Sequence, residues 1–307
     1  MNKKIRLSII SFILFISAHA QDLIKSGPMV GYSTMQEVLL WVQTDEKAKV
    51  HFEYYEIDNP KIRFKTDNKD TDKKSGFVAK LIADEVMPGK KYKYEIFINE
   101  LKVERDYVME FQTQKLWKWR TDPPDVSFVI GSCSYVNEPQ FDRPGKPYGN
   151  NFEIFNSIHS KNPDFMLWLG DNTYLREPDW NSRTGFINRY SHTRALAELQ
   201  PLLASTHHYA TWDDHDFGPN NSDGSFWLKE TASEIFKLFW GNPNYDVTGK
   251  GGITGFFQWG DLDFFLMDNR YHRTSNNNFT EDRQLLGKDQ IDWLINALSF
   301  SQAPFKF

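Results

Sequence analysis

The chain has 307 residues, of which 25% are charged and 16% aromatic, and its formal net charge at pH 7 is −5. A mildly acidic chain has no basic surface able to neutralise many nucleic-acid phosphates, so we expect no sequence-specific nucleic-acid binding. The length suggests about two domains, and the aromatic content favours large, well-filled cores.

The first 20 residues have the three-part pattern of a secretory signal peptide. A basic start at residues 3–6 precedes an apolar run at 7–17, and Ala18-His19-Ala20 is a small-x-small cleavage site. A membrane-spanning helix needs about 20 apolar residues, and neither this run nor any later one reaches that length. We therefore expect cleavage near Ala20 and export, to the periplasm, the cell surface or the medium, of a protein without a transmembrane segment.

Residues 21–115 read as an all-β domain. The clearest strand candidates are 37–42, 49–55 and 91–98, and the last of these alternates apolar and polar residues with period two. Strands separated by turns over about 90 residues are typical of a β-sandwich. The Pro-Gly-x-x-Tyr-x-Tyr pattern that begins at Pro88 resembles fibronectin type III modules, which implies an immunoglobulin-like or fibronectin III-like fold.

A linker is predicted at 116–125, and the pattern changes after it. Strands are expected at 126–130, 165–169 and 209–212, helices at 151–160, 187–205, 227–240 and 287–299, and a hairpin at 256–267. Alternating strands and helices argue for an α/β domain, which we place at 126–307.

Side chains of the kind that bind metals follow three of these strands. Cys133 lies just beyond the first strand, Asp171 beyond the second, and the Asp-Asp-His-Asp run at 213–216 beyond the third. In open α/β sheets, ligands bind outside the carboxyl ends of the strands, so we expect these residues to gather at one edge. Three carboxylates around His215 would be costly to bury without a cation, which favours a metal site.

Individual residues at these positions suit metal binding for separate reasons. Asp171 could bridge two cations with its two oxygens, and Tyr174, three residues on, could reach the same ion as a phenolate. Cys133 is the single cysteine, so it cannot form an internal disulfide, and a thiolate suits a transition metal. The alternatives are a capping Asp171 with a packed Tyr174, an inert core thiol, and a solvated acidic loop with an incidental His215.

Taken in order, the motifs resemble the alkaline phosphatase D (PhoD-like) family of the calcineurin-like metallophosphoesterase superfamily. The blocks that carry the resemblance are Gly131-Ser132-Cys133, Gly170-Asp171-x-x-Tyr174, Trp212-Asp213-Asp214-His215-Asp216 with Asn220-Asn221, and Met267-Asp268-x-Arg270-Tyr271-x-Arg273. Ordered and spaced motifs are more specific than any one of them. The resemblance covers residues 126–307 and implies a metallophosphoesterase-type β-sandwich flanked by helices, behind a β-rich front domain.

The resemblance implies a dinuclear metal centre and a role for each residue of the motifs. Cys133 and Tyr174 would bind iron(III), Asp171 would bridge the iron and a calcium ion, and Asp214 would be the second bridging ligand. His215 would be the catalytic histidine. Arg270 would bind phosphate or brace the site. The groups that support the ligands would be Asp213, Asp216 and Asn220.

The implied activity is hydrolysis of phosphate mono- or diesters, on small molecules or polymer ends, by a water activated between two metals. The family's site closes with a late Gly-Asp-x-His-type block, and none of the eight histidines here lies in one. Residues 304–307 read like the beginning of a strand. We therefore expect the catalytic domain to be incomplete at its C-terminal end, and the 307-residue form to be unstable, weakly metallated and inactive.

Two other hypotheses remain open. A purple-acid-phosphatase-like enzyme would also use Gly-Asp-x-x-Tyr, but that family begins with Asp-x-Gly where this chain has Gly131-Ser132-Cys133. A secreted binding protein with an inactive catalytic domain is the second hypothesis. Against it, all the implied ligands and the catalytic histidine are present.

Overall fold

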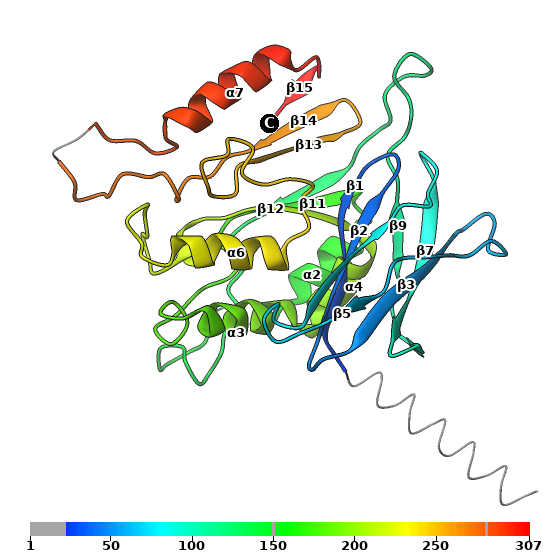
Figure 1. The fold of residues 1–307 in the computed structure, drawn as a ribbon, viewed down its shortest axis with the longest axis horizontal. Coiled ribbons are helices and arrows are strands. Elements are labelled where there is room, and N and C mark those ends of the chain that lie inside the picture. Colours follow the sequence, from blue (N-terminus) through cyan, green and yellow to red (C-terminus); the bar gives the residue numbers. More distant parts are fainter. Residues whose placement is uncertain (1–22, 149–150, 280–281) are drawn as a thin grey trace, which may run out of the picture.

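The structure is a computed structural model, and it describes residues 23–148, 151–279 and 282–307 (Figure 1). The predicted signal peptide at 1–20 lies outside these residues. Within the described ranges, no helix is long and apolar enough to cross a membrane.

The front of the chain forms the β-sandwich that the sequence predicts. Its strands are β1 (Ile24–Ser33), β2 (Val38–Thr44), β3 (Lys49–Glu56), β4 (Phe64–Lys65), β5 (Lys69–Asp70), β6 (Val78–Ala83), β7 (Lys91–Ile98), β8 (Leu101–Val103) and β9 (Glu110–Gln112). One sheet has the order β4-β3-β7-β8, with β5 on β3 and β9 on β7. It packs against β1, β2 and β6 around fully buried side chains such as Leu40, Phe52 and Ile96.

The second part of the chain alternates strands and helices, as expected. The elements are β10 (Phe128–Gly131), α2 (Glu153–His159), β11 (Phe165–Leu169), α3 (Arg183–Arg194), the 3-10 helix η1 (Ala197–Leu199), α4 (Gln200–Ser205), β12 (His207–Thr211), α5 (Asp214–Phe217), α6 (Lys229–Phe239), β13 (Gly255–Trp259), β14 (Leu262–Leu266), α7 (Lys288–Phe300) and β15 (Phe305–Lys306). The single helix expected at 187–205 is three shorter segments, because the backbone of Leu196 is not helical and a new helix begins at Gln200 with Pro201 in its first turn.

One sheet runs through both parts of the molecule, in the order β10-β11-β12-β1-β2-β6. β1 pairs in parallel with β12, with Val30 opposite His207. The sheet therefore contains strands from both sides of the linker predicted at 116–125. The domain limits at 115 and 126 stay predictions, and the structure adds that the two segments of chain share a sheet.

Both faces of β11 and β12 are covered along most of their length, whereas β10 is only partly buried and its Ile130 is 59% exposed. On one face Met166, Trp168 and Trp212 pack under α3 and α6, and on the other Phe165 and Leu167 pack against the small sheet β13-β14-β15. Successive side chains of a strand point to opposite faces, which explains the continuous apolar run in β11. α7 lies along the outer side of the small sheet (Figure 1).

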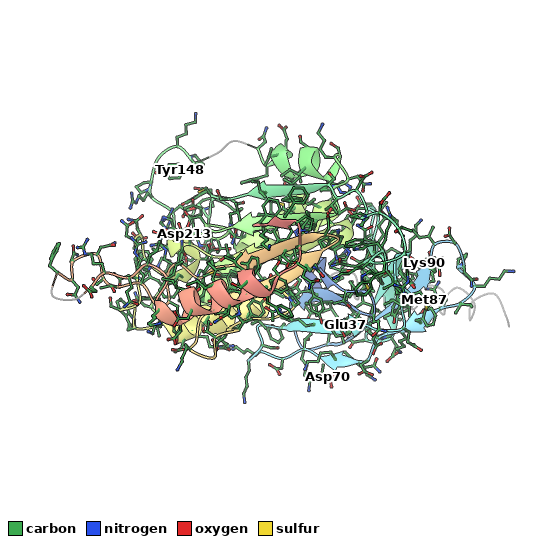
Figure 2. All side chains as sticks on the ribbon, turned by 90° about the horizontal axis from the view of Figure 1, so that it is seen from above. Glu37, Asp70, Met87, Lys90, Tyr148 and Asp213 are labelled. Carbon is green, nitrogen blue, oxygen red and sulfur yellow. The ribbon has the colours of Figure 1, made fainter. Side chains whose placement is uncertain are left out.

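The parallel pairing of β10, β11 and β12 aligns their carboxyl ends. Gly131 lies opposite Trp168, and Leu169 lies opposite Thr211. The loops that follow the three strands therefore meet at one edge of the sheet. Figure 2 shows Asp213 of this edge at one end of the molecule and Lys90 of the front sandwich at the other.

Candidate metal centre

The loop after β11 touches the loop after β12 at Gly170. A Cβ at Gly170 would lie 2.7 Å from the backbone nitrogen of Asp213, so the close approach of the two loops leaves no room for a side chain. The φ angle of Gly170 is +101°, a conformation that glycine adopts readily. The glycine of the Gly-Asp motif is therefore needed to bring Asp171 beside the loop that carries residues 213–216.

The loop after β10 is hydrogen-bonded to the loop after β11. The backbone nitrogen of Cys133 donates to the carbonyl of Gly170 at 3.2 Å, and that of Ser134 donates to the carbonyl of Asp171 at 2.9 Å. Cys133 and Asp171 have φ angles of +58° and +51°. Positive φ is uncommon outside glycine, and such strained residues cluster at functional sites.

Cys133, Asp171 and Tyr174 converge at this edge. The Cys133 side chain is exposed, and its Sγ lies 4.0 Å from Asp171 Oδ2. Burial raises the pKa of the half-buried Tyr174 phenol strongly, and the neighbouring Asp171 and Cys133 raise it further. The phenol would therefore ionise only with a cation beside it.

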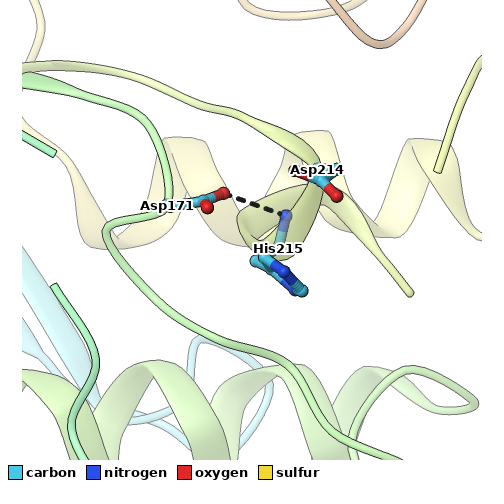
Figure 3. A group of neighbouring side chains, drawn as sticks. All are labelled: Asp171, Asp214 and His215. Atoms are coloured by element: carbon cyan, nitrogen blue, oxygen red, sulfur yellow. Dashed lines mark hydrogen bonds between the residues drawn. The ribbon is translucent and has the colours of Figure 1, made fainter. Parts of the chain in front are cut away.

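Asp171, Asp214 and His215 form a second group around the same carboxylate. One ligand atom from each of the three lies within 4.8 Å of the others (Figure 3). The backbone nitrogen of His215 donates to Asp171 Oδ1 at 3.3 Å, whereas the other oxygen, Oδ2, lies toward Cys133. Asp171 thus belongs to both groups: its Oδ2 lies near Cys133, and its Oδ1 accepts from the main chain of His215.

The electrostatics of Asp171 also point to a missing positive charge. Burial raises the pKa of its carboxyl, His215 opposes that rise, and the charges of Asp214 and Asp213 add to it. No described lysine or arginine forms an ion pair with Asp171. The arginine at this edge, Arg270, pairs with Asp213 and Asp214 instead. His215 Nδ1 is buried and has no hydrogen-bond partner in the described part of the chain.

Asp216 is a structural carboxylate. It is fully buried and accepts hydrogen bonds from the backbone nitrogens of Asn172 and Thr173, both at 3.0 Å, and of Asp213, at 3.1 Å. Burial raises the pKa of Asp216, and the three donors oppose that rise. The side chain therefore holds the loop after β11 against α5, and its supporting role at a metal site stays a prediction.

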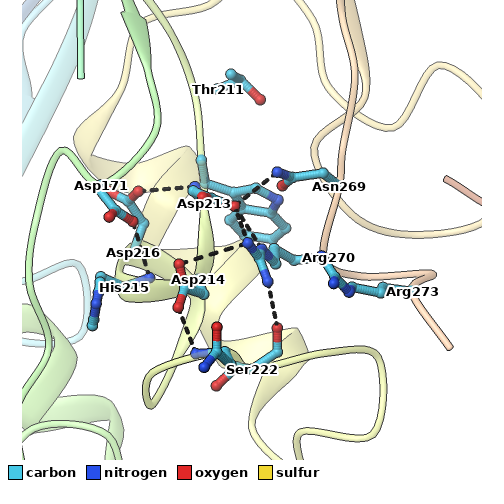
Figure 4. Close-up of polar contacts among 12 residues, drawn as sticks. Asp171, Thr211, Asp213, Asp214, His215, Asp216, Ser222, Asn269, Arg270 and Arg273 are labelled. Carbon is cyan, nitrogen blue, oxygen red and sulfur yellow. Dashed lines mark hydrogen bonds and ion pairs between the residues drawn. The ribbon is translucent and has the colours of Figure 1, made fainter. Parts of the chain in front are cut away.

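Arg270 is engaged on every side by the protein (Figure 4). Its Nε donates to Asp213 Oδ1 at 2.6 Å, its Nη2 contacts Asp213 and lies 3.6 Å from Asp214 Oδ1, and its Nη1 donates to the carbonyl of Ser222 at 3.2 Å. Only 7% of the residue is exposed. Of the two roles expected for Arg270, this geometry favours bracing Asp213 and Asp214 over binding phosphate.

Asn220 lies away from these contacts. It is exposed in the turn after α5, and its side chain has no hydrogen bond within the described residues. The backbone nitrogen of Asn221 instead donates to Asp214 Oδ2. The second asparagine of the pair is thus the one that touches the site, through its main chain.

Asp268 is a supporting residue for which the motif implied no role. It is fully buried, and its Oδ1 accepts from Trp212 Nε1 at 2.7 Å and from the backbone nitrogens of Arg270 and Tyr271 at 2.9 Å each. Its Oδ2 accepts from the Ile253 nitrogen at 3.0 Å. The carboxylate therefore fixes the loop that presents Arg270. The Asp-x-Arg spacing could have predicted a turn held by the Asp268 side chain. It could not have predicted the donors from Trp212 and Ile253, which lie far away in the sequence.

The donor set fits a metal centre. Thiol, phenol and carboxylate groups meet at one edge, and a thiol is a good ligand for a transition metal and a poor one for magnesium or calcium. Carboxylates crowded at a partly buried edge need a cation, and Arg270 supplies one only to Asp213 and Asp214. Asp171, Asp214 and His215 form a candidate metal site.

Comparison with known proteins finds relatives in structure only. No protein-family model matches the chain, and no curated protein matches its sequence. The structure of PhoD aligns over 93% of this chain with a TM-score of 0.74 and 18% identity. The purple acid phosphatase PPD1 from yellow lupin (Lupinus luteus) seeds aligns over 92% with a TM-score of 0.61 and 11% identity.

The chain spans 62% of the length of the PhoD structure and 51% of the lupin phosphatase. The agreement in fold covers both the front sandwich and the mixed α/β part. This protein has the metallophosphoesterase-like fold of PhoD and of purple acid phosphatase.

Proposed function

We propose that this protein is a secreted, metal-dependent phosphoester hydrolase of the PhoD type. The observation that carries the proposal is the position of Asp171. One of its oxygens lies toward Cys133, and the other toward the backbone of His215 beside Asp214. A carboxylate shared by two groups of ligand atoms is what a dinuclear hydrolase requires.

The residues present fit two different ions. Cys133, Tyr174 and Asp171 would hold iron(III), which accepts thiolate and phenolate ligands. Asp171 and Asp214 would share a second ion, calcium, which prefers oxygen ligands. A dinuclear centre supplies positive charge for the phosphoryl oxygens and lowers the pKa of the attacking water.

The chain's own groups would orient the ester and move a proton. The His215 ring lies in a half-buried position 4.5 Å from the ring of Tyr174, where it can donate a proton to the leaving group. Arg270 would hold Asp213 and Asp214 in place. Cys133 is exposed and Asp171 is half-buried, so a small phosphate ester or the end of a polymer can reach the edge.

A purple-acid-phosphatase-like enzyme is the second candidate, because the lupin enzyme shares the fold. The proximity of Cys133 Sγ to Asp171 favours the PhoD type, since that family is the one with a cysteine in its first block. Cys133→Ser should lower the iron(III) content of a PhoD-type site and leave that of the second candidate unchanged.

The test measures metal content and hydrolysis together in a complete, metal-loaded protein. The substrates are p-nitrophenyl phosphate, a monoester, and bis(p-nitrophenyl) phosphate, a diester. The parent should bind two ions and hydrolyse at least one ester, and Asp214→Asn should lower both properties. The control is Asp289→Asn, an exposed carboxylate in the first turn of α7, which should match the parent.

Failure on both esters, with Asp214→Asn changing neither metal content nor rate, would refute the proposal. Metal binding that depends on Asp214 but yields no hydrolysis would support the secreted binding protein instead.

A further inference from the structure

Tyr174 is packed within a set of rings and one cation. Its ring centroid lies 4.5 Å from that of His215 and 4.8 Å from that of Tyr135. The guanidinium carbon of Arg176 lies 4.8 Å from the centroid of Tyr135 and 5.5 Å from that of Tyr174. Cations within about 6 Å of an aromatic centroid are attracted by the ring, so Arg176 interacts with both phenols.

Arg176 is held in this position by polar contacts. Its Nε donates to the hydroxyl of Tyr135 at 3.1 Å, and this hydroxyl donates to Asp142 Oδ1 at 2.7 Å. Nε also lies 3.6 Å from Asp142 Oδ1, and the backbone nitrogen of Arg176 donates to Asp179 Oδ2 at 2.9 Å. The side chain is 15% exposed, so these contacts are largely shielded from water.

The carboxylates that hold Arg176 are themselves fixed by a second, fully buried arginine. Arg189 Nε donates to Asp179 Oδ2 at 2.8 Å, and Arg189 lies 3.6 Å from Asp142 and 3.5 Å from Glu138. Asp142 and Asp179 are thus shared by both arginines. A buried network of this kind is costly to assemble and to rearrange, so it fixes the loops on which Arg176 and Tyr135 lie.

We infer that Arg176 is a positioning residue for Tyr174. Through Tyr135 and its own guanidinium it holds the phenol ring over the metal-binding edge, and it places a positive charge beside the ring. The inference rests on the proposed function for its metal, but the placement of the ring is a property of the metal-free protein.

The experiment compares four variants with the parent. Arg176→Gln removes the charge, Arg176→Lys keeps it without the planar fork, and Tyr135→Phe keeps the ring without its hydroxyl. The control is Arg183→Gln. It removes the arginine of an exposed ion pair with Glu234, which does not belong to the network around Tyr174 described above. Tyr174→Phe, made in the parent and in each variant, identifies the signal that belongs to Tyr174.

The first readout is near-ultraviolet circular dichroism of the metal-free proteins. Arg176→Gln should lose most of the Tyr174 signal, Arg176→Lys and Tyr135→Phe should lose part of it, and Arg183→Gln should keep it. The second readout is the visible phenolate-to-iron(III) absorption together with the iron(III) dissociation constant. Arg176→Gln should shift the absorption band and weaken binding roughly tenfold, the scale on which residues behind a ligand affect metal affinity.

Arg176→Gln with a parental Tyr174 signal and a parental iron(III) dissociation constant would overturn the inference. If Arg176→Gln does not fold, Tyr135→Phe decides, because it removes only one hydroxyl: an unchanged Tyr174 signal there would overturn the inference. If the parent binds no iron(III), the proposed function fails, and the dichroism of the metal-free variants still decides whether Arg176 positions Tyr174.

Discussion

The two ends of β12 carry histidines in opposite situations. At the amino end His208 uses both ring nitrogens: Nδ1 accepts from Trp168 Nε1 at 2.9 Å, and Nε2 donates to the Leu202 carbonyl at 3.2 Å. Beyond the carboxyl end, the buried Nδ1 of His215 has no partner in the described part of the chain, and the residue lies beside the carboxylate of Asp171.

His207, next to His208, repeats the first situation. Its Nδ1 donates to the Gly31 carbonyl at 2.8 Å and its Nε2 accepts from the Gln112 nitrogen at 3.2 Å, which ties β12 to β1 and β9. Burial lowers the pKa of His207 to about 4 and that of His208 to about 3, so both are neutral. A histidine with both nitrogens paired belongs to the framework, and one with an open nitrogen near carboxylates can carry a proton.

The largest expected effect separates these two roles. His215→Gln should slow hydrolysis of a phosphate ester by the metal-loaded chain about 10²–10⁴-fold, the usual contribution of a general acid. The free energy of unfolding should change by about 1 kcal/mol or less, because the Nδ1 of His215 has no hydrogen bond to lose and only the ring contact with Tyr174 is removed. Steady-state rates and urea unfolding measure the two quantities.

The matched control is His208→Gln, for which the pattern should reverse. The glutamine amide cannot place its oxygen and nitrogen where the two ring nitrogens lie, so the buried hydrogen bonds with Trp168 Nε1 and the Leu202 carbonyl are weakened, which should cost about 1–3 kcal/mol of stability. Activity per folded molecule should stay parental. A large loss of rate in His208→Gln at unchanged stability would contradict the comparison.

The dependence of stability on pH gives an intermediate effect. The pKa values of His207 and His208 are lowered from 6.5 to about 4 and about 3, so the unfolded chain takes up their protons at higher pH than the folded chain. Their contribution is complete above pH 6.5 and is lost as the pH falls toward 4, by about 1.4 kcal/mol per pH unit for each histidine.

Urea unfolding between pH 7.5 and 4.5 measures this slope. The half-buried carboxyl of Asp171 and the buried carboxyl of Asp216 have raised pKa values and act with the opposite sign, so the parent alone does not isolate the histidines. The difference between the parent and His208→Gln isolates the contribution of His208. An identical slope in the two proteins would show that His208 is not held neutral.

The smallest expected effect concerns Asn220. Asn220→Ala should change the hydrolysis rate and the free energy of unfolding within experimental error, because the side chain is exposed and makes no hydrogen bond to a described residue. Metal titration and urea unfolding check this. A marked loss of metal affinity would return Asn220 to the supporting role that the motif implies.

Much of the site could be predicted because its signals are local. Apolar runs such as 165–169 mark buried strands, and the residues that follow them mark the strand ends. Since β10, β11 and β12 are parallel, these ends meet at one edge, which brings Cys133 and Asp171 together. The partners of the supporting side chains depend on contacts between segments that are distant in the sequence, and local patterns do not predict such contacts.

The β-rich front, the alternating strands and helices behind it, and the residue types at the strand ends can all be read from local patterns, because periodicity and turn residues act over a few positions. The pairing of β1 with β12 in one sheet and the hold of Asp268 on the loop of Arg270 emerge only from the folded chain. The fold also decides which histidine nitrogens are paired. Each of these depends on burial and on partners far away in the chain, so identical residue types acquire different chemistry.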